Sequence, residues 1–327
     1  MNVLVAGGAG YIGSHVIRAL QSAGYSCVAY DNLSKGHRAA VGDCPLIVGD
    51  VGDAEALTAA LRDHDIELVI HFAAFIEAGE SVVKPEKYFR NNTLNGLTLL
   101  ESMREAGVGK LVFSSTAAVY GTPESVPIRE TDRLAPINPY GSSKLCTEYM
   151  MQAYAAAHEM GFVALRYFNV AGAHPDGDIG EDHAPETHLI PLILQVPLGQ
   201  REDIKIFGDD YDTPDGTCIR DYIHVCDLAD AHVLAAANVE PGAMKAYNLG
   251  NGAGFSVKEV IETCRNVTGH PIPAETAPRR AGDPARLVAA SDKAVTEMGW
   301  KRNFADLETI VAGAWDWHRE HPDGYDD

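Results

Sequence analysis

The sequence lacks the features that mark several large classes of protein. Its six cysteines are scattered and form no Cys-x-x-Cys pair, so neither a disulfide framework nor a cysteine metal centre is predicted. No apolar run approaches the ~20 residues that a membrane span needs, and no charged-then-apolar leader precedes the first apolar run. The thirteen histidines show no His-Glu-x-x-His or similar spacing, so we expect no metal site.

Positive charge is also scarce, with 26 Lys and Arg against 46 Asp and Glu and a net charge of −20. A chain this acidic repels nucleic acid and anionic membranes, so neither is expected as a partner. Scattered cysteines and the missing leader favour a cytoplasmic protein with reduced thiols. With 327 residues, 46% of them hydrophobic, the chain can form one large domain or two.

The first half of the sequence alternates short apolar runs with amphipathic stretches. Buried strands are predicted at 1–7, 26–31, 45–50, 67–73, 110–115 and 162–169. Helices are predicted at 13–23, 53–63, 91–107 and 141–160. This alternation indicates an α/β fold, a doubly wound parallel sheet of the Rossmann type with helices on both faces.

The pattern changes after Gly172, where 172–188 is rich in Gly, Pro, Asp and His and predicts a long loop over a ligand. A strand and then a helix are predicted in 218–238, another strand in 245–252, and mixed, irregular structure beyond. We infer a smaller, interleaved α/β domain. The larger domain is expected to comprise 1–177 with 221–250, and the smaller one 178–220 with 251–327.

A glycine-rich turn joins the first predicted strand to the first predicted helix. In VLVAGGAGYIGSH, Gly7, Gly10 and Gly13 permit a tight turn, close approach to a pyrophosphate and close packing of helix on strand. Asp31 ends the second strand about 20 residues further on, where a carboxylate can accept a hydrogen bond from a ribose 2′-hydroxyl. That carboxylate repels the extra phosphate of NADP, so the pattern predicts bound NAD.

Tyr140 and Lys144 lie one helical turn apart in NPYGSSK, directly after Pro139. Proline is accepted in the first turn of a helix, and residues four apart share a helix face. A nearby positive charge favours the phenolate, so we expect Lys144 and the positive nicotinamide ring of NAD⁺ to lower the pKa of Tyr140 from ~10 towards neutrality. The spacing alone is common, and a solvated Tyr–Lys pair is the alternative.

Five segments in order, AGGAGYIGSH, FSSTAAVYG, NPYGSSK, LRYFN and RDYIHVCDLADAH, resemble the extended short-chain dehydrogenase/reductase family. The resemblance covers the whole chain and, within that family, is greatest to the UDP-glucose 4-epimerases. It implies an NAD-dependent isomerase of galactose metabolism that interconverts UDP-galactose and UDP-glucose through a transient 4-keto sugar. It also implies a homodimer formed through the helices predicted at 91–107 and 141–160.

The resemblance assigns three catalytic residues: Tyr140 as the base, Lys144 on the nicotinamide ribose, and Thr116 on the reacting hydroxyl. It implies cofactor contacts by Gly7, Gly10, Tyr11, Ile12, Gly13, Asp31, Asn32, Asp50, Val51, Phe72, Ala73, Ala74, Asn91, Ser114, Tyr140, Lys144 and Tyr167. It implies substrate contacts by Thr116, Tyr140, Asn169, His188, Leu189, Phe207, Arg220, Arg280 and Asp283.

Among the substrate contacts, Arg220 and Arg280 are expected to clamp the diphosphate with their guanidinium forks. Asp283 is expected to face the uridine ribose, and Phe207 to lie near the uracil.

Three positions depart from the family pattern. Ile76 stands where some relatives have a cofactor-contacting lysine, and His188 where an asparagine is often found. Leu287 occupies a position that gates the size of the sugar. The choice among UDP-glucose, UDP-GlcNAc and UDP-pentoses therefore stays open.

The same fold also supports other reactions, which need different residues. A 4,6-dehydratase needs Asp-Glu after the Ser/Thr, whereas Ala117 and Ala118 follow Thr116 here and cannot move protons. A decarboxylase or uronate epimerase needs a cationic site for the sugar carboxylate, and none is identified. A plain dehydrogenase stays open, because the same Tyr and Lys would serve it. A non-catalytic sensor of NAD or nucleotide sugar would have no need of the complete set of Thr116, Tyr140 and Lys144.

Overall fold

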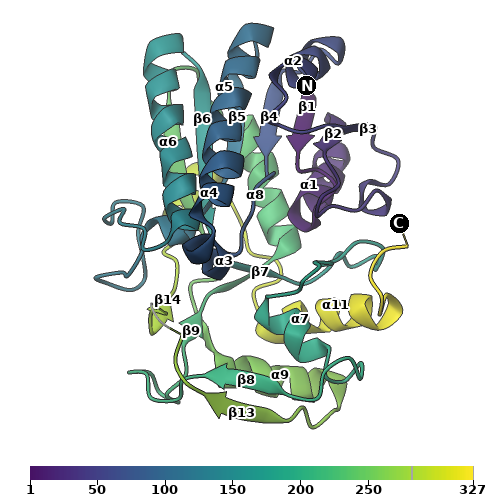
Figure 1. Cartoon of the computed structure of the whole chain (residues 1–327), viewed down its shortest axis with the longest axis vertical. Helices are drawn as coiled ribbons and strands as arrows, with labels where there is room; N and C mark the ends of the chain where they lie inside the picture. The colour runs from purple at the N-terminus through teal and green to yellow at the C-terminus, as the bar shows by residue number, and fades with distance from the viewer. Residues whose placement is uncertain (281–282, 327) are drawn as a thin grey trace.

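The computed structural model describes residues 1–280 and 283–326. A seven-stranded sheet, parallel throughout, dominates the upper part of the molecule in Figure 1, with strand order β11-β6-β5-β4-β1-β2-β3. Its strands are β1 (Asn2–Ala6), β2 (Ser26–Asp31), β3 (Leu46–Val48), β4 (Leu68–His71), β5 (Lys110–Thr116), β6 (Gly161–Tyr167) and β11 (Met244–Leu249). The predicted doubly wound α/β fold is confirmed.

Helices cover both faces of this sheet because its strands are apolar on both sides. In β1, Val3 and Val5 belong to one hydrophobic core, whereas Leu4 and Ala6 belong to another. The first core is closed by α1 (Tyr11–Ser22), α8 (Val225–Ala237) and α10 (Asp292–Met298). The second is closed by α2 (Ala54–Asp63), α5 (Asn95–Ala106) and α6 (Pro139–His158).

Short elements link the longer ones on the α5 and α6 side. Before α5 come α3 (Ala78–Val83), α4 (Pro85–Tyr88) and the π-helical turn η2 (Phe89–Leu94). Two 3₁₀ turns, η1 (Ala39–Val41) and η3 (Ala117–Val119), follow β2 and β5. The helix predicted at 91–107 is thus a π-helical turn that continues into an α-helix.

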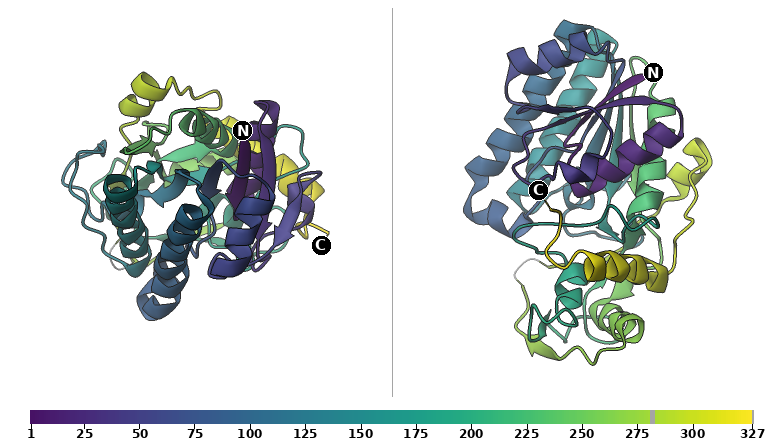
Figure 2. Two further views of the ribbon diagram at one scale, coloured as in Figure 1. Left: turned by 90° about the horizontal axis from the view of Figure 1, so that it is seen from above. Right: turned by 90° about the vertical axis from the view of Figure 1, so that its right-hand side faces the viewer.

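A smaller set of elements packs below the carboxyl ends of the large sheet (Figures 1 and 2). Its helices are α7 (Leu189–Leu194), α9 (Val257–Thr268) and α11 (Leu307–Glu320), which share one core. Its strands form the pairs β8 (Ile204–Phe207) with β13 (Ala274–Ala277) and β7 (Asn169–Ala171) with β10 (Tyr222–His224), and the trio β12 (Phe255–Ser256), β9 (Ile219–Arg220) and β14 (Arg286–Leu287).

The expectation of mixed, irregular structure beyond 252 was wrong, because α9, α10 and α11 all lie there. Ser256 and Glu259 form a reciprocal capping box at the start of α9. That Ser-x-x-Glu signal was present in the sequence and could have located the helix.

No helix within the two described ranges combines the length and apolarity that crossing a membrane requires. All six cysteines are free thiols, and four of them are buried.

Candidate active site

A cavity of about 390 Å³ opens at the carboxyl ends of the parallel strands, where α/β sheets bind their ligands. Sixteen of the predicted cofactor contacts line it: Gly7, Gly10, Tyr11, Ile12, Gly13, Asp31, Asn32, Asp50, Val51, Phe72, Ala73, Ala74, Asn91, Ser114, Tyr140 and Tyr167. Of the predicted substrate contacts, Thr116, Tyr140, Asn169 and His188 also line it. One cavity therefore joins the glycine turn to the candidate base.

The glycine turn packs so closely against neighbouring backbone that two of its positions have no room for a side chain. Gly7 has a φ of +82°, and a Cβ there would lie 2.6 Å from the amide nitrogen of Ala73. A Cβ at Gly13 would overlap the carbonyl oxygen of Gly7. Gly10 caps α1 without any side-chain hydrogen bond, and the first turn of α1 holds no acidic residue. The positive end of α1 therefore suits a pyrophosphate.

Asp31 is fixed at the end of β2 by backbone donors. Its carboxylate accepts hydrogen bonds from the amides of Ala9 (3.0 Å) and Leu33 (2.8 Å), while its burial raises its pKa. Asn32 Nδ2 donates to Asp50 Oδ2 at 2.8 Å, which ties together the loops after β2 and β3. The carboxylates of Asp31 and Asp50 are thus both held at the side of the cavity where the adenosine half of NAD is predicted to bind.

Tyr140 stands in the first turn of α6. Pro139 opens this helix, and Asn138 caps it by accepting a hydrogen bond from the amide of Gly141 at 2.8 Å. Burial raises the pKa of Tyr140, and a hydrogen bond with Thr116 opposes that rise. Thr116 Oγ1 also accepts a hydrogen bond from the amide of Ala118 at 3.1 Å, which orients the hydroxyl.

Lys144 lies behind Tyr140 and does not line the cavity. Its Nζ donates to the carbonyl of Ser114 at 2.8 Å and sits 5.0 Å from the ring centroid of Phe113. Burial lowers the pKa of Lys144 to about 7. Burial acts against the charged form of both groups, so in the protein alone Lys144 does not lower the pKa of Tyr140 below its usual value. The lowering expected when NAD⁺ is also present stays a prediction.

A buried ion pair joins α6 to strand β6 of the large sheet. The Arg166 guanidinium on β6 holds the Glu148 carboxylate on α6 through bonds of 3.0 Å and 2.6 Å. Ser115 Oγ donates to the same carboxylate at 2.5 Å, and Arg166 donates to the hydroxyl of Tyr120 at 2.9 Å. This network joins α6 to β5 and β6, and so sets the distance between Tyr140 and Thr116.

The other predicted substrate contacts lie in the smaller part of the molecule, outside the cavity lining. Arg220 Nη2 pairs with Asp283 Oδ1 at 2.8 Å, and the Arg280 guanidinium carbon lies 3.9 Å from the ring centroid of Phe207. Leu189 begins α7. The four predicted nucleotide contacts thus form two pairs, Arg220 with Asp283 and Arg280 with Phe207.

Two of the positions that depart from the family pattern can also be placed. Ile76 lines the cavity, so an apolar side chain stands where a lysine was a possible cofactor contact. Leu287 on β14 is the register partner of Arg220 on β9.

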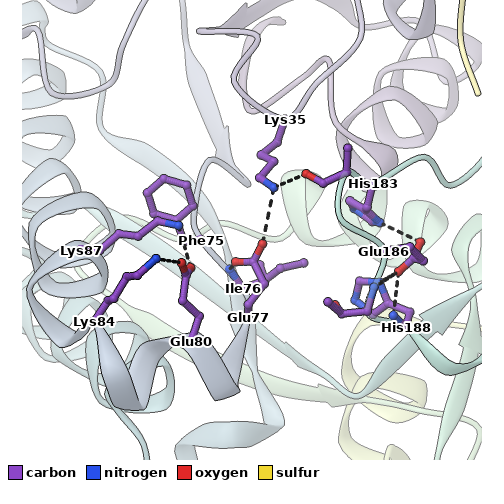
Figure 3. Close-up of polar contacts among 12 residues, drawn as sticks. Lys35, Phe75, Ile76, Glu77, Glu80, Lys84, Lys87, His183, Glu186 and His188 are labelled. Carbon is purple, nitrogen blue, oxygen red and sulfur yellow. Dashed lines mark hydrogen bonds and ion pairs between the residues drawn. The ribbon is translucent and has the colours of Figure 1, made fainter. Parts of the chain in front are cut away.

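Sequence reasoning missed a lysine contact that joins three loops near the cavity mouth (Figure 3). Lys35 Nζ, in the loop after β2, donates to the carbonyl of Ala184 at 2.6 Å and lies 3.8 Å from Glu77 Oε1. Lys35, Glu77, Glu181 and His183 also line the cavity. The only sequence signal for the last two was their place in 172–188, the loop predicted to cover a ligand.

A parallel sheet whose glycine turn, strand-end carboxylate and buried phenol face one cavity defines a dinucleotide-binding protein equipped for proton transfer. Residues 3–250 match the NAD dependent epimerase/dehydratase family. A relative from Halalkalibacterium halodurans, named UDP-glucose 4-epimerase, is 56% identical over 99% of this chain and 98% of its own length. The chain therefore belongs to the NAD dependent epimerase/dehydratase family.

Solved structures of similar proteins share this fold over nearly the whole chain. A UDP-glucose 4-epimerase from Brucella ovis in complex with NAD is 46% identical, with a TM-score of 0.92 over 96% of this chain and 97% of its own. One from Bifidobacterium longum in complex with NAD⁺ and UDP is 39% identical, with a TM-score of 0.95 over 99% of this chain and 100% of its own.

Proposed function

We propose that this protein is a UDP-glucose 4-epimerase. It interconverts UDP-galactose and UDP-glucose through a transient 4-keto sugar, with NAD held throughout. The observation that carries the proposal is that Thr116 and Tyr140 share one cavity with the glycine turn, in a chain that matches epimerases end to end. The N-terminus of α1, which has no side-chain cap and no acidic residue in its first turn, is suited to the pyrophosphate of NAD.

NAD, when bound, would supply the hydride chemistry at C4 of the sugar. Tyr140 takes the proton from the 4-hydroxyl and gives it back, and Thr116 holds that hydroxyl in line with the phenol. By the family resemblance, Lys144 would hold the nicotinamide ribose hydroxyls, exchanging its hydrogen bond to the carbonyl of Ser114 for them. Because burial raises the pKa of Tyr140, the positive charge that accompanies NAD⁺ must lower it.

The smaller part of the molecule grips the nucleotide. Arg220 and Arg280 clamp the diphosphate, Asp283 faces the uridine ribose and Phe207 lies near the uracil. This assignment divides the chain into an NAD-binding domain of 1–177 with 221–250 and a nucleotide-sugar domain of 178–220 with 251–327. The Arg220–Asp283 pair supports it, because a carboxylate that already holds the arginine can be exchanged for a diphosphate.

The enzyme is a cytoplasmic homodimer of galactose metabolism in this proposal. Six free thiols suit a reducing compartment. Apolar side chains stand exposed on η2 and α6, namely Phe89 (40% exposed), Leu94 (51%) and Tyr149 (55%). Paired across a two-fold axis, these elements would bury that surface in an intersubunit helix bundle.

An epimerase of wider specificity is the second candidate. Leu287 is smaller than the tyrosine that excludes N-acetylated sugars in the family pattern, and it lies beside Arg220. UDP-GlcNAc and UDP-pentoses are therefore the alternative substrates.

One assay tests both candidates. The purified protein is incubated with UDP-galactose, UDP-GlcNAc and UDP-arabinose without added cofactor, and the products are read by NMR. Formation of UDP-glucose from UDP-galactose supports the proposal. No conversion of any substrate, with or without added NAD, would overturn it. Stoichiometric accumulation of NADH would instead show a dehydrogenase.

A further inference from the structure

Four side chains from one irregular loop converge beside the cavity. They are Glu181, His183, Glu186 and His188, all between β7 and α7. Figure 3 shows three of them, His183, Glu186 and His188. Each offers one metal-ligating atom, and these four atoms lie within 4.8 Å of one another. His183 and His188 are close neighbours, with ring centroids 5.0 Å apart.

The distances fit a shared central cation. His188 Nδ1 lies 2.9 Å from both Glu181 Oε1 and Glu186 Oε1. His183 Nδ1 lies 3.2 Å from Glu181 Oε1 and 3.6 Å from Glu186 Oε2. The single proton on an Nδ1 points in one direction and serves one acceptor well, yet each ring nitrogen faces two carboxylates. Ligand atoms bonded tetrahedrally to Zn²⁺ at about 2.0–2.1 Å lie roughly 3.3 Å apart, within the observed spread.

Burial and charge also favour a cation. The side chains of Glu181 and Glu186 are only 5% and 8% exposed. With both imidazoles neutral, the cluster carries two negative charges in a poorly solvated place, which a divalent ion neutralises. His183 and His188 line the cavity, so an ion can enter from there.

We propose that Glu181, His183, Glu186 and His188 bind one Zn²⁺ ion, which fastens the loop 172–188 over the cavity. Two imidazoles and two carboxylates suit Zn²⁺, whereas Mg²⁺ and Ca²⁺ prefer oxygen ligands alone. Four protein ligands leave no open position, so the site is structural. His188 ligates through Nδ1, and its Nε2 stays available to the substrate. This proposal departs from the sequence-based expectation of no metal, which rested on helical ligand spacings.

A second group of possible metal ligands on the same loop is more exposed and already contains a positive charge. His174, Asp176 and Asp178 surround Arg18, whose Nη1 lies 3.1 Å from His174 Nδ1 and 2.6 Å from Asp178 Oδ1. The two carboxylates are 74% and 52% exposed. A guanidinium already provides the positive charge, so this group serves as a control.

The competing arrangement is metal-free, with both histidines protonated and paired to the carboxylates. In that arrangement the carboxylates raise the pKa of His183 to about 9 and that of His188 well above its usual value. Zinc requires both Nδ1 atoms to be deprotonated. The two arrangements therefore differ in whether the Nδ1 atoms of His183 and His188 carry protons, which can be measured.

The test is metal binding by the untagged, full-length protein. After treatment with a chelator, the wild type is titrated with Zn²⁺ and with Co²⁺, whose visible absorption reports tetrahedral geometry. We expect one equivalent of either ion and a tetrahedral Co²⁺ spectrum. His183→Ala and Glu186→Gln should bind at least tenfold more weakly, and His174→Ala should bind as the wild type does.

Glu186→Gln keeps an oxygen that can accept from the amides of Thr187 and His188, and circular dichroism checks that each variant is folded. The proposal is overturned if the wild type binds neither ion, or if the folded Glu186→Gln variant binds as tightly. Nitrogen-15 NMR that shows both imidazoles doubly protonated with Zn²⁺ present would overturn it as well. No substrate is used, so the outcome is independent of the epimerase activity.

Discussion

At the scale of single residues, the site depends on a phenol and an amine that are both buried. Burial raises the pKa of Tyr140 and lowers that of Lys144, so it acts against the charged form of each. In the proposed mechanism, positive charge brought by the cofactor would favour the phenolate of Tyr140. Tyr140 would then act as a base only while the cofactor is bound.

Replacing Tyr140 with phenylalanine should remove the proton acceptor and leave the binding surfaces intact. We expect kcat for UDP-galactose to fall by about 10²–10⁴-fold, the usual contribution of a positioned base. Affinity for UDP, measured by calorimetry, should change little. Near-full activity in Tyr140→Phe would show that another group moves the proton.

Lys144 gives a prediction about stability and pH. Burial lowers its pKa from 10.5 to about 7, so between these pH values the unfolded chain holds a proton that the folded chain lacks. Stability of the cofactor-free protein should therefore rise with pH across that window, relative to Lys144→Met, by about 1.4 kcal/mol per pH unit. Urea denaturation of both proteins at pH 7.5, 8.5 and 9.5 measures this difference. A difference that does not vary with pH would contradict the assigned pKa.

At the scale of elements, strand ends and helix starts bring the site together. The carboxyl ends of β2, β4, β5 and β6 and the first turns of α1 and α6 surround one cavity. Loops close it from the other side, and their contacts join residues far apart in the sequence. Lys35 and Ala184 are such a pair.

Lys35 links the loops after β2, β4 and β7, so its loss should speed the escape of NAD. A charged hydrogen bond contributes ~1.5–3 kcal/mol, which predicts release of NAD from Lys35→Met that is roughly tenfold faster or more. The NAD content of the protein after timed dialysis reports the rate. Lys84→Met removes a lysine that is 59% exposed and paired with Glu80, and it should retain NAD like the wild type. If Lys35→Met and Lys84→Met retain NAD equally well, Lys35 does not slow the release of NAD.

The ion pair between Arg166 and Glu148 is 6% and 4% exposed and holds α6 against β6. Arg166→Met leaves a buried carboxylate unpaired, so we expect the free energy of unfolding to drop by about 3–5 kcal/mol. Arg62→Met breaks an exposed pair with Glu105 and should cost at most about 1 kcal/mol. Chemical denaturation compares the two, and equal losses would contradict the account.

The parts of the fold and of the site that could be predicted are those with a short-range sequence signature. The glycine turn, the proline-started α6 and the apolar strand runs each have a short-range physical signature, and the structure places them as expected. The Lys35 contact and the Glu181–His188 cluster could not be predicted, because loop contacts leave no periodic pattern. The direction of the Tyr140 pKa in the protein alone could not be predicted either, because residue spacing does not report burial.

At the scale of the whole molecule, two parts divide the task. The large sheet presents the cofactor cavity, and the smaller part carries Arg220 and Arg280, outside the cavity lining. Epimerisation requires that the nucleotide be gripped while the sugar turns over. If Arg220 and Arg280 hold the diphosphate as proposed, that grip lies outside the cavity that Tyr140 lines, and the sugar can turn. Overall acidity opposes anionic ligands, so the local arginines must offset it.

The central claim is that the hydrogen taken from C4 of the sugar returns to the same carbon. UDP-glucose deuterated at C4 tests this directly, with NMR of the UDP-galactose that is formed. The account predicts full retention of deuterium at C4 and no accumulation of NADH. Loss of the label to solvent, or its appearance elsewhere in the sugar, would contradict it.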